Sequence, residues 1–465
     1  ETMRHQGVME AQVLYALGVR PRWDPAGRVV GLQTLTAADL RRPRIDVLLS
    51  VTGSYRDQFP VVMRWIDEAV QQAAAQNEPD NVVARHSAQL TQAFTRQGLS
   101  AAQARRLAMA RVFSNEAGSY GTGLNEATLA SDTWRGTGAG GGDAQMADLY
   151  LARMGHAQGA GLDGPASAAV QAARQQVYAR NLAQVDAALL SRTSHTYGML
   201  TSDDPFQYLG GIALAVRQLT GKDPALYVQN LRDSSEVSTE SAARSLAKEM
   251  QTRYLHPQWI AAQKAEGYSG TLQVLKTAQF LWGWQVTAPA SVRPDHWQSL
   301  HDVYVRDQYQ LGTRAWLEGD NRAAFAQTLE RMLDAVRLNY WQPDAATRRE
   351  LVQAYREALH ASGLRERNRT VQRFADLQVV SAAAQHAPSA AAPGTRATPQ
   401  AGAEPAAPTV RGLQLLLQPE PPVPPPSQAT PWAVWALLLS LLLGGGWRQS
   451  RRLRQPPNLA WAARS

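Results

Sequence analysis

The sequence predicts a helix-rich, multidomain α/β body over residues 1–380, followed by a disordered linker over residues 381–430 and a single transmembrane helix over residues 431–447. Three observations lead to this prediction. An apolar, β-prone run over residues 45–51 breaks into a polar loop, long Ala-, Gln- and Arg-rich stretches are typical of helices, and the 17 residues 431–447 carry no charge. With 465 residues, the chain is long enough to bury the core of more than one domain.

Polar loops and glycines mark where the elements of the body end. The run at 45–51 predicts a buried strand that breaks at Gly53 and leads through Arg56 and Asp57 into helices over residues 60–110. Glycines at positions 118, 121 and 123 interrupt the helical pattern, and they permit close approach of the backbone to a bulky group. We expect helix again up to about residue 190, and a further helix beginning at Gly210 and Gly211.

The charge-free run over residues 431–447 predicts a membrane anchor. Trp432, Trp435 and Trp447 lie at its two ends, and an Ala- and Pro-rich linker precedes it. A buried core helix is the alternative, because a bilayer requires about 20 apolar residues and this run is short. Four arginines lie within residues 448–454, whereas residues 412–430 contain none. The positive-inside rule therefore predicts an inner-membrane protein of a Gram-negative cell, with a periplasmic body and a cytoplasmic tail over residues 448–465.

Composition excludes several classes of function. The chain has no cysteine, so disulfides, thiolate metal sites and cysteine nucleophiles are excluded. The net charge is +8, but the arginines are interleaved with acids and no basic patch with aromatic residues is present, so we expect no nucleic-acid partner. No GxxxxGK[ST] phosphate loop occurs, so ATP would act only through a partner protein. The first residues are typical of a helix that has already begun, and we therefore expect the C-terminal part of a longer protein.

The run SRTSHTYGMLTSDDPFQYLGG, residues 191–211, combines an arginine, a histidine and two adjacent aspartates within a short stretch. These groups are costly to bury together unless they pair with one another or with a ligand. The run therefore predicts one wall of a ligand site. The Gly210-Gly211 step is expected to let a helix begin close against that ligand.

Seven motifs resemble, in family order, the large subunit of cobaltochelatase and its porphyrin-binding counterpart in magnesium chelatase. They include LYALGVRPRWDPAGRVVG, RPRIDVLLSVTGSYRDQFP, ARVFSNEAGSYGTGLN and SDDPFQYLGGIALAV, and the resemblance extends over roughly residues 1–345. It implies a chelatase large-subunit fold. This chain resembles only the C-terminal third or so of such a subunit. The resemblance also implies a protein that handles a tetrapyrrole and its metal.

The stretch YGMLTSDDPF, residues 197–206, departs from the metal-inserting members of the family, which carry an acidic run resembling D-x-L-D-S-D-D at this place. Gly198 and Thr201 stand where acids would be, and His195 lies just upstream. This stretch is more similar to a membrane-anchored branch of the family that is associated with haem uptake. The resemblance therefore implies removal or exchange of a divalent metal, iron or cobalt, from a haem or a corrin.

The residue types in these motifs suit the movement of a metal into or out of a macrocycle. Imidazole ligates iron or cobalt, carboxylates transfer protons to pyrrole nitrogens or accept a departing ion, and arginines bind propionates. The predicted metal ligands are His195 and Glu116. The predicted catalytic residues are His195, Glu116, Asp203 and Asp204, and the predicted tetrapyrrole-binding residues are Arg56, Arg192, Tyr120, Tyr197, Tyr208 and Trp284.

Structural roles compete with several of these assignments. Asp203 or Asp204 would cap the helix that follows, His256 before a proline would fix a turn, and Trp282 and Trp284 would pack in the core. Three functions stay open. The first is a membrane-anchored enzyme that removes the metal from haem, with transport proteins as partners. The second is the large subunit of an ATP-dependent cobaltochelatase in cobalamin biosynthesis, with separate ATPase subunits. The third is a non-catalytic tetrapyrrole or metal carrier.

Overall fold

The computed structural model describes residues 2–136, 138–159, 161–162, 167–194, 196–233, 235–364 and 368–386, with side chains up to residue 379. The described residues belong to the first of two units of the chain, Glu1–Ser389. His195, the predicted transmembrane helix at 431–447, the tail at 448–465 and most of the predicted linker lie outside the described residues. Within the part of the chain that is described, no helix is long and apolar enough to cross a bilayer.

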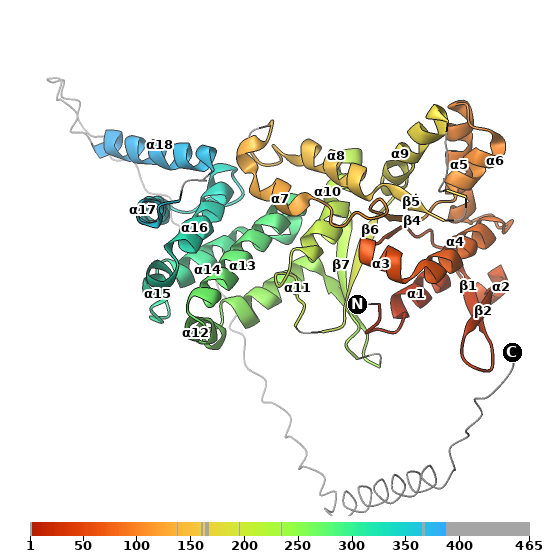
Figure 1. Cartoon of the computed structure of the whole chain (residues 1–465), viewed down its shortest axis with the longest axis horizontal. Helices are drawn as coiled ribbons and strands as arrows, with labels where there is room; N and C mark the ends of the chain where they lie inside the picture. Colours follow the sequence, from red (N-terminus) through yellow and green to blue (C-terminus); the bar gives the residue numbers. More distant parts are fainter. Residues whose placement is uncertain are drawn as a thin grey trace, which may run out of the picture. The chain divides into compact units, whose positions relative to one another are not determined.

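The first part of the body alternates helices with short strands (Figure 1). Local signals set the beginnings of its helices: Pro60 occupies the first turn of α4, the Asn81 side chain caps α5, and Ser100 forms a capping box with Gln103 at α6. The helices predicted over residues 60–110 are confirmed. The elements are α1 (Val8–Leu17), β1 (Val19–Trp23), β2 (Val29–Thr34), α2 (Ala37–Leu40), β3 (Leu49–Ser50), α3 (Gly53–Gln58), α4 (Pro60–Ala74), α5 (Val82–Arg96), α6 (Ala101–Ala108), β4 (Val112–Ser114), α7 (Leu124–Leu129), α8 (Asp143–Met154), β5 (His156–Gln158) and α9 (Ala168–Leu182).

The strand predicted at residues 45–51 is shorter than expected. Only β3, at its carboxyl end, forms a ladder; it pairs in parallel with β4, which pairs antiparallel with β5. The Ile45 amide instead donates to the Ala16 carbonyl of α1 over 2.9 Å, and the Ile45 side chain is 52% exposed. Since β4 is only three residues long, it can pair with no more than the end of the predicted run.

The helix expected up to residue 190 is wrong in its last part. α9 ends at Leu182, and residues 187–192 form strand β6 (Ala187–Arg192). β6 pairs in parallel with β7 (Ala225–Asn230) over its whole length, and β7 pairs antiparallel with β8 (Ser238–Ser241). A short apolar run fits a buried strand or a helix equally well, and here the pairing with β7 decides between them.

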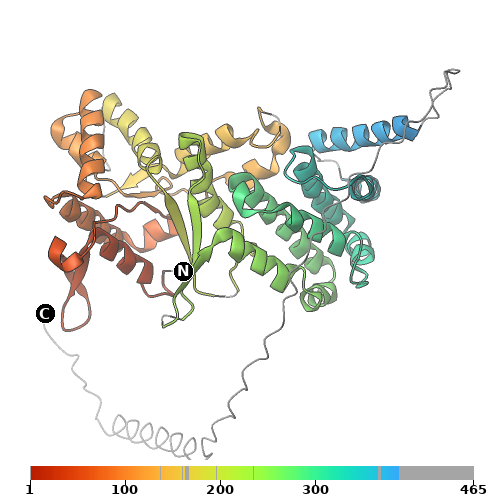
Figure 2. The ribbon, with the colours of Figure 1, turned by 180° about the vertical axis from the view of Figure 1, so that it is seen from behind.

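Helices make up the rest of the body. Both views place α12–α18 on the opposite side of β6 and β7 from α1–α4 (Figures 1 and 2). α13 lies at the centre of this region, with Trp282 and Trp284 fully buried. The helix α18 continues to His386, past the predicted beginning of the linker at 381. The elements are a π-helical turn (Phe206–Gly210) that leads into α10 (Gly211–Thr220), α11 (Ala242–Glu249) with a second π-helical turn (Met250–Tyr254), α12 (Pro257–Ala265), α13 (Tyr268–Thr287), α14 (Pro294–Tyr304), α15 (Thr313–Asp320), α16 (Arg322–Arg337), α17 (Ala345–Ser362) and α18 (Arg369–His386).

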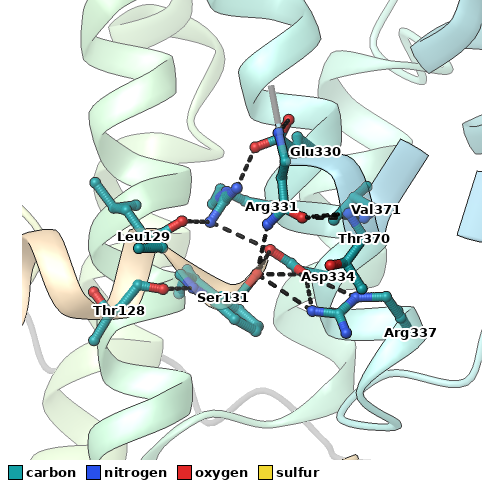
Figure 3. A network of polar contacts seen from close by, with 12 residues as sticks. Thr128, Leu129, Ser131, Glu330, Arg331, Asp334, Arg337, Thr370 and Val371 are labelled. Atoms are coloured by element: carbon teal, nitrogen blue, oxygen red, sulfur yellow. Dashed lines mark hydrogen bonds and ion pairs between the residues drawn. The ribbon is translucent and has the colours of Figure 1, made fainter. Parts of the chain in front are cut away.

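A buried carboxylate fastens α16 to the segment that follows α7 (Figure 3). Asp334 is completely buried and accepts hydrogen bonds from the Ser131 hydroxyl, at 3.0 and 2.9 Å. Two arginines of α16 neutralise it: Arg337 lies 2.7 Å away and Arg331 lies 3.3 Å away. Asn368, just before α18, donates to the Ser131 hydroxyl over 2.6 Å. This network therefore connects α16 with the segment after α7, 203 residues earlier in the sequence, and with the residue just before α18.

We predict that Asp334→Ala lowers the free energy of unfolding by about 3–5 kcal/mol, because it leaves buried guanidinium groups without their carboxylate. Chemical denaturation followed by circular dichroism measures the change. Asp376→Ala is the control, because Asp376 is exposed and its ion pair with Arg356 is 3.7 Å long. The control should change stability by less than about 1 kcal/mol. Equal effects of the two variants would contradict the role given to the network.

Candidate functional site

Three loops that carry predicted site residues follow the carboxyl ends of strands. The loop after β3 includes the short helix α3 (Gly53–Gln58), which carries Arg56. The loop after β4 carries Glu116 and Tyr120, and the loop after β6 carries Asp203 and Asp204. β3 is parallel to β4, so the first two loops leave their sheet at the same edge. Such edges are where open α/β sheets bind ligands.

Arg56 ties the first two loops together. Its guanidinium donates through Nη1 to the backbone carbonyls of Asn115, at 2.8 Å, and Glu116, at 2.7 Å. Its Nε donates to Asp57 over 2.8 Å, and the Tyr120 hydroxyl donates to the same carboxylate over 2.7 Å. These hydrogen bonds from Arg56 and Tyr120 lower the pKa of Asp57. Most donors of Arg56 are therefore used within the protein, and only Nη2, which is buried without a hydrogen-bond partner, remains for a ligand.

The side chains at the tip of the second loop face solvent. Glu116 is exposed, and Tyr120 is 59% exposed with its ring centroid 5.7 Å from the Arg56 guanidinium carbon. Gly53 permits this packing, because a Cβ there would lie 2.7 Å from the Tyr120 ring. Glu116 and Tyr120 are therefore accessible to a ligand, as a role in binding requires.

A carboxylate that the sequence analysis did not identify holds the third loop. Glu249, at the end of α11, is 7% exposed and accepts hydrogen bonds from the amides of Met199, at 2.5 Å, and Leu200, at 3.2 Å. Gly198 makes room for it, since a Cβ at Gly198 would lie 2.1 Å from the Glu249 carboxylate. No signal in the sequence connects Glu249 with residues 50 positions earlier, apart from the small residue at 198.

Arg192 and Trp284 support this loop from the protein side. Arg192 donates to the Tyr197 carbonyl over 3.2 Å and lies 3.8 Å from the Glu249 carboxylate. Trp284 is fully buried in α13 and donates from its indole nitrogen to the Met199 carbonyl over 2.9 Å. Both side chains position the backbone of the loop. The tetrapyrrole contacts predicted for them stay predictions, as does that of Tyr197, which is 51% exposed.

Asp203 connects the third loop with the second. Its carboxylate accepts from the Gln207 side-chain amide nitrogen over 2.6 Å, and the side-chain oxygen Oε1 of Gln207 accepts from the Thr122 hydroxyl over 2.8 Å. Asp204 reaches solvent, and partial burial together with the charge of Asp203 raises its pKa. Burial and the charge of Asp204 also raise the pKa of Tyr208. The structure thus brings the Asp203-Asp204 pair and the Glu116 loop into one connected region.

Other predicted features have structural roles. The Gly210-Gly211 step allows close packing between helices, because a Cβ at Gly210 would lie 2.2 Å from the Thr287 hydroxyl and one at Gly211 would lie 2.4 Å from the Tyr150 ring. The expectation that this step approaches a ligand stays a prediction. His256 caps α12, with Nδ1 accepting from the Gln258 amide over 3.2 Å, as the alternative for this residue predicted.

The predicted metal site depends on His195, which lies outside the described residues. Among the residues that are described, no three His, Asp or Glu side chains gather so that they could hold a metal ion. The assignment of His195 and Glu116 as metal ligands therefore stays a prediction.

A cavity of about 840 Å³ lies beside β3 and β6. Its walls come from α1, residues 44–51, the beginning of α5 and residues 181–191, and it extends to Tyr55 and Ser191. These two residues directly precede Arg56 and Arg192, but none of the predicted site residues lines the cavity. The volume is in the range of small-molecule sites, which is about 300–1,000 Å³.

We predict that Gly198→Ala lowers the free energy of unfolding by about 1–3 kcal/mol, because the new methyl group displaces the Glu249 carboxylate from two backbone amides. In a Glu249→Ala background the same substitution should be nearly neutral, so a double-mutant cycle measures the coupling. Gly319→Ala is the control, since a Cβ at Gly319 meets no atom within 4 Å. Additive effects of the two substitutions would contradict this account of the loop.

Comparisons with known proteins identify relatives over most of the chain. A model of the family described as CobN/Magnesium Chelatase matches residues 1–348. The aerobic cobaltochelatase subunit CobN of Pseudomonas aeruginosa is 32% identical over 362 residues, which are 77% of this chain and 27% of that protein. The H subunit of magnesium chelatase from Cereibacter sphaeroides is 32% identical over 351 residues, which are 75% of this chain and 27% of that protein.

A solved structure is similar as well. The catalytic subunit of cobaltochelatase from Mycobacterium tuberculosis superimposes with a TM-score of 0.67 at 31% identity, covering 76% of this chain and 28% of that chain. The helix-rich α/β large-subunit fold predicted for the body is thereby confirmed. The chain spans little more than a quarter of the length of these relatives.

Proposed function

The chain belongs to the CobN/magnesium chelatase family, and on this premise we propose that the protein binds a tetrapyrrole and removes or exchanges its metal, as a haem dechelatase would. The single observation that carries the proposal is that hydrogen bonds connect the three loops, with the Glu116 loop joined both to Arg56 and, through Gln207, to Asp203. Glu116 and Tyr120 reach solvent in the same region, so a macrocycle would meet carboxylates, a phenol and one remaining Arg56 donor together.

The need to supply protons favours metal removal as the direction of the reaction. Taking a divalent metal out of a tetrapyrrole breaks the bonds from its nitrogens to the metal, and two of those nitrogens must then receive protons. Asp204 suits this task, because partial burial and the neighbouring charge of Asp203 raise its pKa and so favour the protonated carboxyl. Asp203 is the carboxylate that would receive the departing ion, with His195 as a ligand on the metal.

The departure from the acidic run of metal-inserting relatives supports the same direction. Insertion requires a site that attracts a hydrated divalent cation, and oxygen ligands of several carboxylates provide this. In this chain position 198 is a glycine that packs against Glu249, and position 201 is a threonine whose hydroxyl is 2.7 Å from the Gly198 amide. Two of the acids that would attract an incoming cation are therefore replaced by residues that shape the loop.

A second candidate function is the large subunit of an ATP-dependent cobaltochelatase that inserts cobalt into a corrin ring. Two relatives named as cobaltochelatase subunits, 29% and 32% identical to this chain, favour it. It would require separate ATPase subunits, because the chain carries no GxxxxGK[ST] motif. A non-catalytic tetrapyrrole carrier is the third candidate, and it would bind the macrocycle without changing the metal.

The experiment that separates these functions incubates the full-length protein with haem, and follows the absorption of bound haem and the fluorescence of released metal-free porphyrin. We predict that His195→Ala leaves folding nearly intact, changes the absorption spectrum of bound haem and slows metal removal at least about tenfold, or roughly 1.4 kcal/mol of barrier. Asp148→Asn is the control, because Asp148 is an exposed carboxylate on α8.

Each outcome points to one function. Cobalt insertion that appears only with ATPase subunits and ATP would support the cobaltochelatase function and exclude the dechelatase. Haem binding without any metal movement would support the carrier. If His195→Ala binds and demetallates haem as the parent does, the predicted metal ligand is wrong.

The proposed setting is the inner membrane, with residues 431–447 as a single span, the body in the periplasm and residues 448–465 in the cytoplasm. The arginine asymmetry around residues 431–447 supports this orientation. A periplasmic body would have no ATP pool, which favours the dechelatase over an ATP-dependent insertion. Transport proteins that deliver haem would then be its partners.

We predict that a reporter fused after Ser465 behaves as cytoplasmic, and that protease added to spheroplasts digests the body. Western blotting against the body measures its digestion, with a cytoplasmic protein as the control for intact cells. A body that resists the protease in intact spheroplasts but is digested after lysis would contradict the proposed orientation.

A further inference from the structure

Gln207 lies between the second and third loops of the site, and both sides of its side-chain amide are hydrogen-bonded. Its Nε2 donates to Oδ2 of Asp203 over 2.6 Å, and its Oε1 accepts from the Thr122 hydroxyl over 2.8 Å. Gln207 is buried in the π-helical turn Phe206–Gly210, and such turns are frequent at functional sites. Thr122 is completely buried in the loop between β4 and α7. A residue of the second loop is therefore connected to the carboxylate of the third loop through a single side chain.

The Thr122 hydroxyl fixes which way the Gln207 amide turns. An ionised carboxylate only accepts hydrogen bonds, so Asp203 must meet the NH2 group of Gln207 rather than its oxygen. The amide oxygen then faces Thr122 and needs a donor there, which the hydroxyl supplies. Oγ1 of Thr122 in turn accepts from the Leu124 amide over 3.1 Å, so its one proton is available for Gln207. Three hydrogen bonds therefore run in one direction, from the Leu124 amide to the Asp203 carboxylate.

Asp203 is held through one of its two carboxylate oxygens. Oδ2 accepts from the Gln207 side chain, and the backbone carbonyl of Asp203 accepts from the Gln207 amide over 3.0 Å. Among the residues that the structure describes, none donates a hydrogen bond to Oδ1 and no cation forms an ion pair with Asp203. The side chain is only partly buried. The carboxylate thus has one fixed oxygen and one oxygen that is available to a ligand.

Apolar packing, and not this chain of hydrogen bonds, anchors the turn that carries Gln207. Phe206 and Leu209 on either side of it are almost completely buried. Phe206 packs closely on α13, because a Cβ at Gly283 would lie 2.7 Å from the Phe206 ring. Loss of the Thr122 hydroxyl should therefore leave the turn in place and change mainly the orientation of the Gln207 amide.

We propose that Thr122 and Gln207 are positioning residues for metal removal, which hold Oδ2 of Asp203 so that Oδ1 remains for the departing ion. This inference rests on the proposed function, in which Asp203 receives that ion. Thr122 and Gln207 are buried, so they act through Asp203 and not by contact with the tetrapyrrole. Without the hydroxyl, the amide oxygen of Gln207 lacks a donor, the amide is free to turn that oxygen toward Asp203, and the carboxylate loses its fixed position.

The test measures kcat and KM for the release of metal-free porphyrin from haem by the full-length protein. Thr122→Val keeps the shape of the side chain but removes the hydroxyl, and it should lower kcat at least about tenfold while KM changes less than about twofold. Thr122→Ser keeps the hydroxyl and should hold kcat within about threefold of the parent value. Thr128→Val is the matched control, because Thr128 is also completely buried and its hydroxyl donates to the Asn125 carbonyl over 3.0 Å, away from Gln207. The control should leave kcat and KM within about twofold of the parent values.

Gln207→Leu is the second variant, and it decides the question alone if thermal melting shows that Thr122→Val does not fold. It should lower kcat as much as Thr122→Val does, and the two substitutions together should lower it no further, because the hydroxyl acts only through the Gln207 amide.

Several outcomes would overturn the inference while leaving the proposed function intact. They are an unchanged kcat in Thr122→Val or Gln207→Leu, an equal loss in Thr128→Val, a loss in Thr122→Ser as large as that in Thr122→Val, and independent effects of the two substitutions. If the parent protein releases no metal-free porphyrin from haem, the proposed function fails, and the inference fails with it.

Discussion

The structure depends on one constraint: a carboxylate taken out of water must be supplied with donors or cations by its neighbours. Asp334 receives a hydroxyl and two guanidinium groups, and Glu249 receives two backbone amides. Asp46 receives Arg111 and His86. In each case at least one donor comes from a segment distant in sequence, so satisfying the charge also fixes the position of a loop or a helix. Among the loops of the candidate site, the third is held in this way, by the Glu249 carboxylate.

The parts of the fold that could be predicted from the sequence are those with local causes. The starts of α4, α5 and α6 follow from Pro60, Asn81 and Ser100, whose effects act within one turn of helix. The end of the strand at residue 51 follows from the change from apolar to polar residues, but the loop expected after it is wrong, because Thr52 caps the helix α3 there. The strand at 187–192 could not be predicted in this way, because its partner is β7, more than 30 residues further along the chain.

The candidate site could be predicted in its loops but not in its supports. Arg56, Asp203 and Tyr120 stand in motifs whose residue types already indicate chemistry, and the structure connects their loops. Glu249 lies in the ordinary helical stretch AARSLAKE, and nothing local distinguishes it from an exposed surface acid. Trp284 has a structural role that its motif does not indicate, because its indole nitrogen donates to the Met199 carbonyl inside the core.

Gly198 connects the shape of the loop with its chemistry. An acid at this position would bring a second carboxylate against Glu249, and two like charges in a site with little water raise the cost of both. In this geometry an anchoring carboxylate at position 249 is therefore incompatible, without a large electrostatic cost, with an acidic side chain at position 198. Glycine at this position leaves room for the Glu249 carboxylate to hold the loop through the amides of Met199 and Leu200.

The cavity extends to Tyr55 and Ser191, which directly precede Arg56 and Arg192 in the sequence. In the third loop Asp204 has a raised pKa because of partial burial and its neighbour Asp203. Asp204 therefore keeps its proton to a higher pH than a free aspartate does. In the cavity lining Glu10 has an oxygen that would accept a hydrogen bond from a donor. The surroundings of the two carboxyl groups therefore differ, because Asp204 is exposed beside a second carboxylate and Glu10 has one buried oxygen without a hydrogen-bond partner.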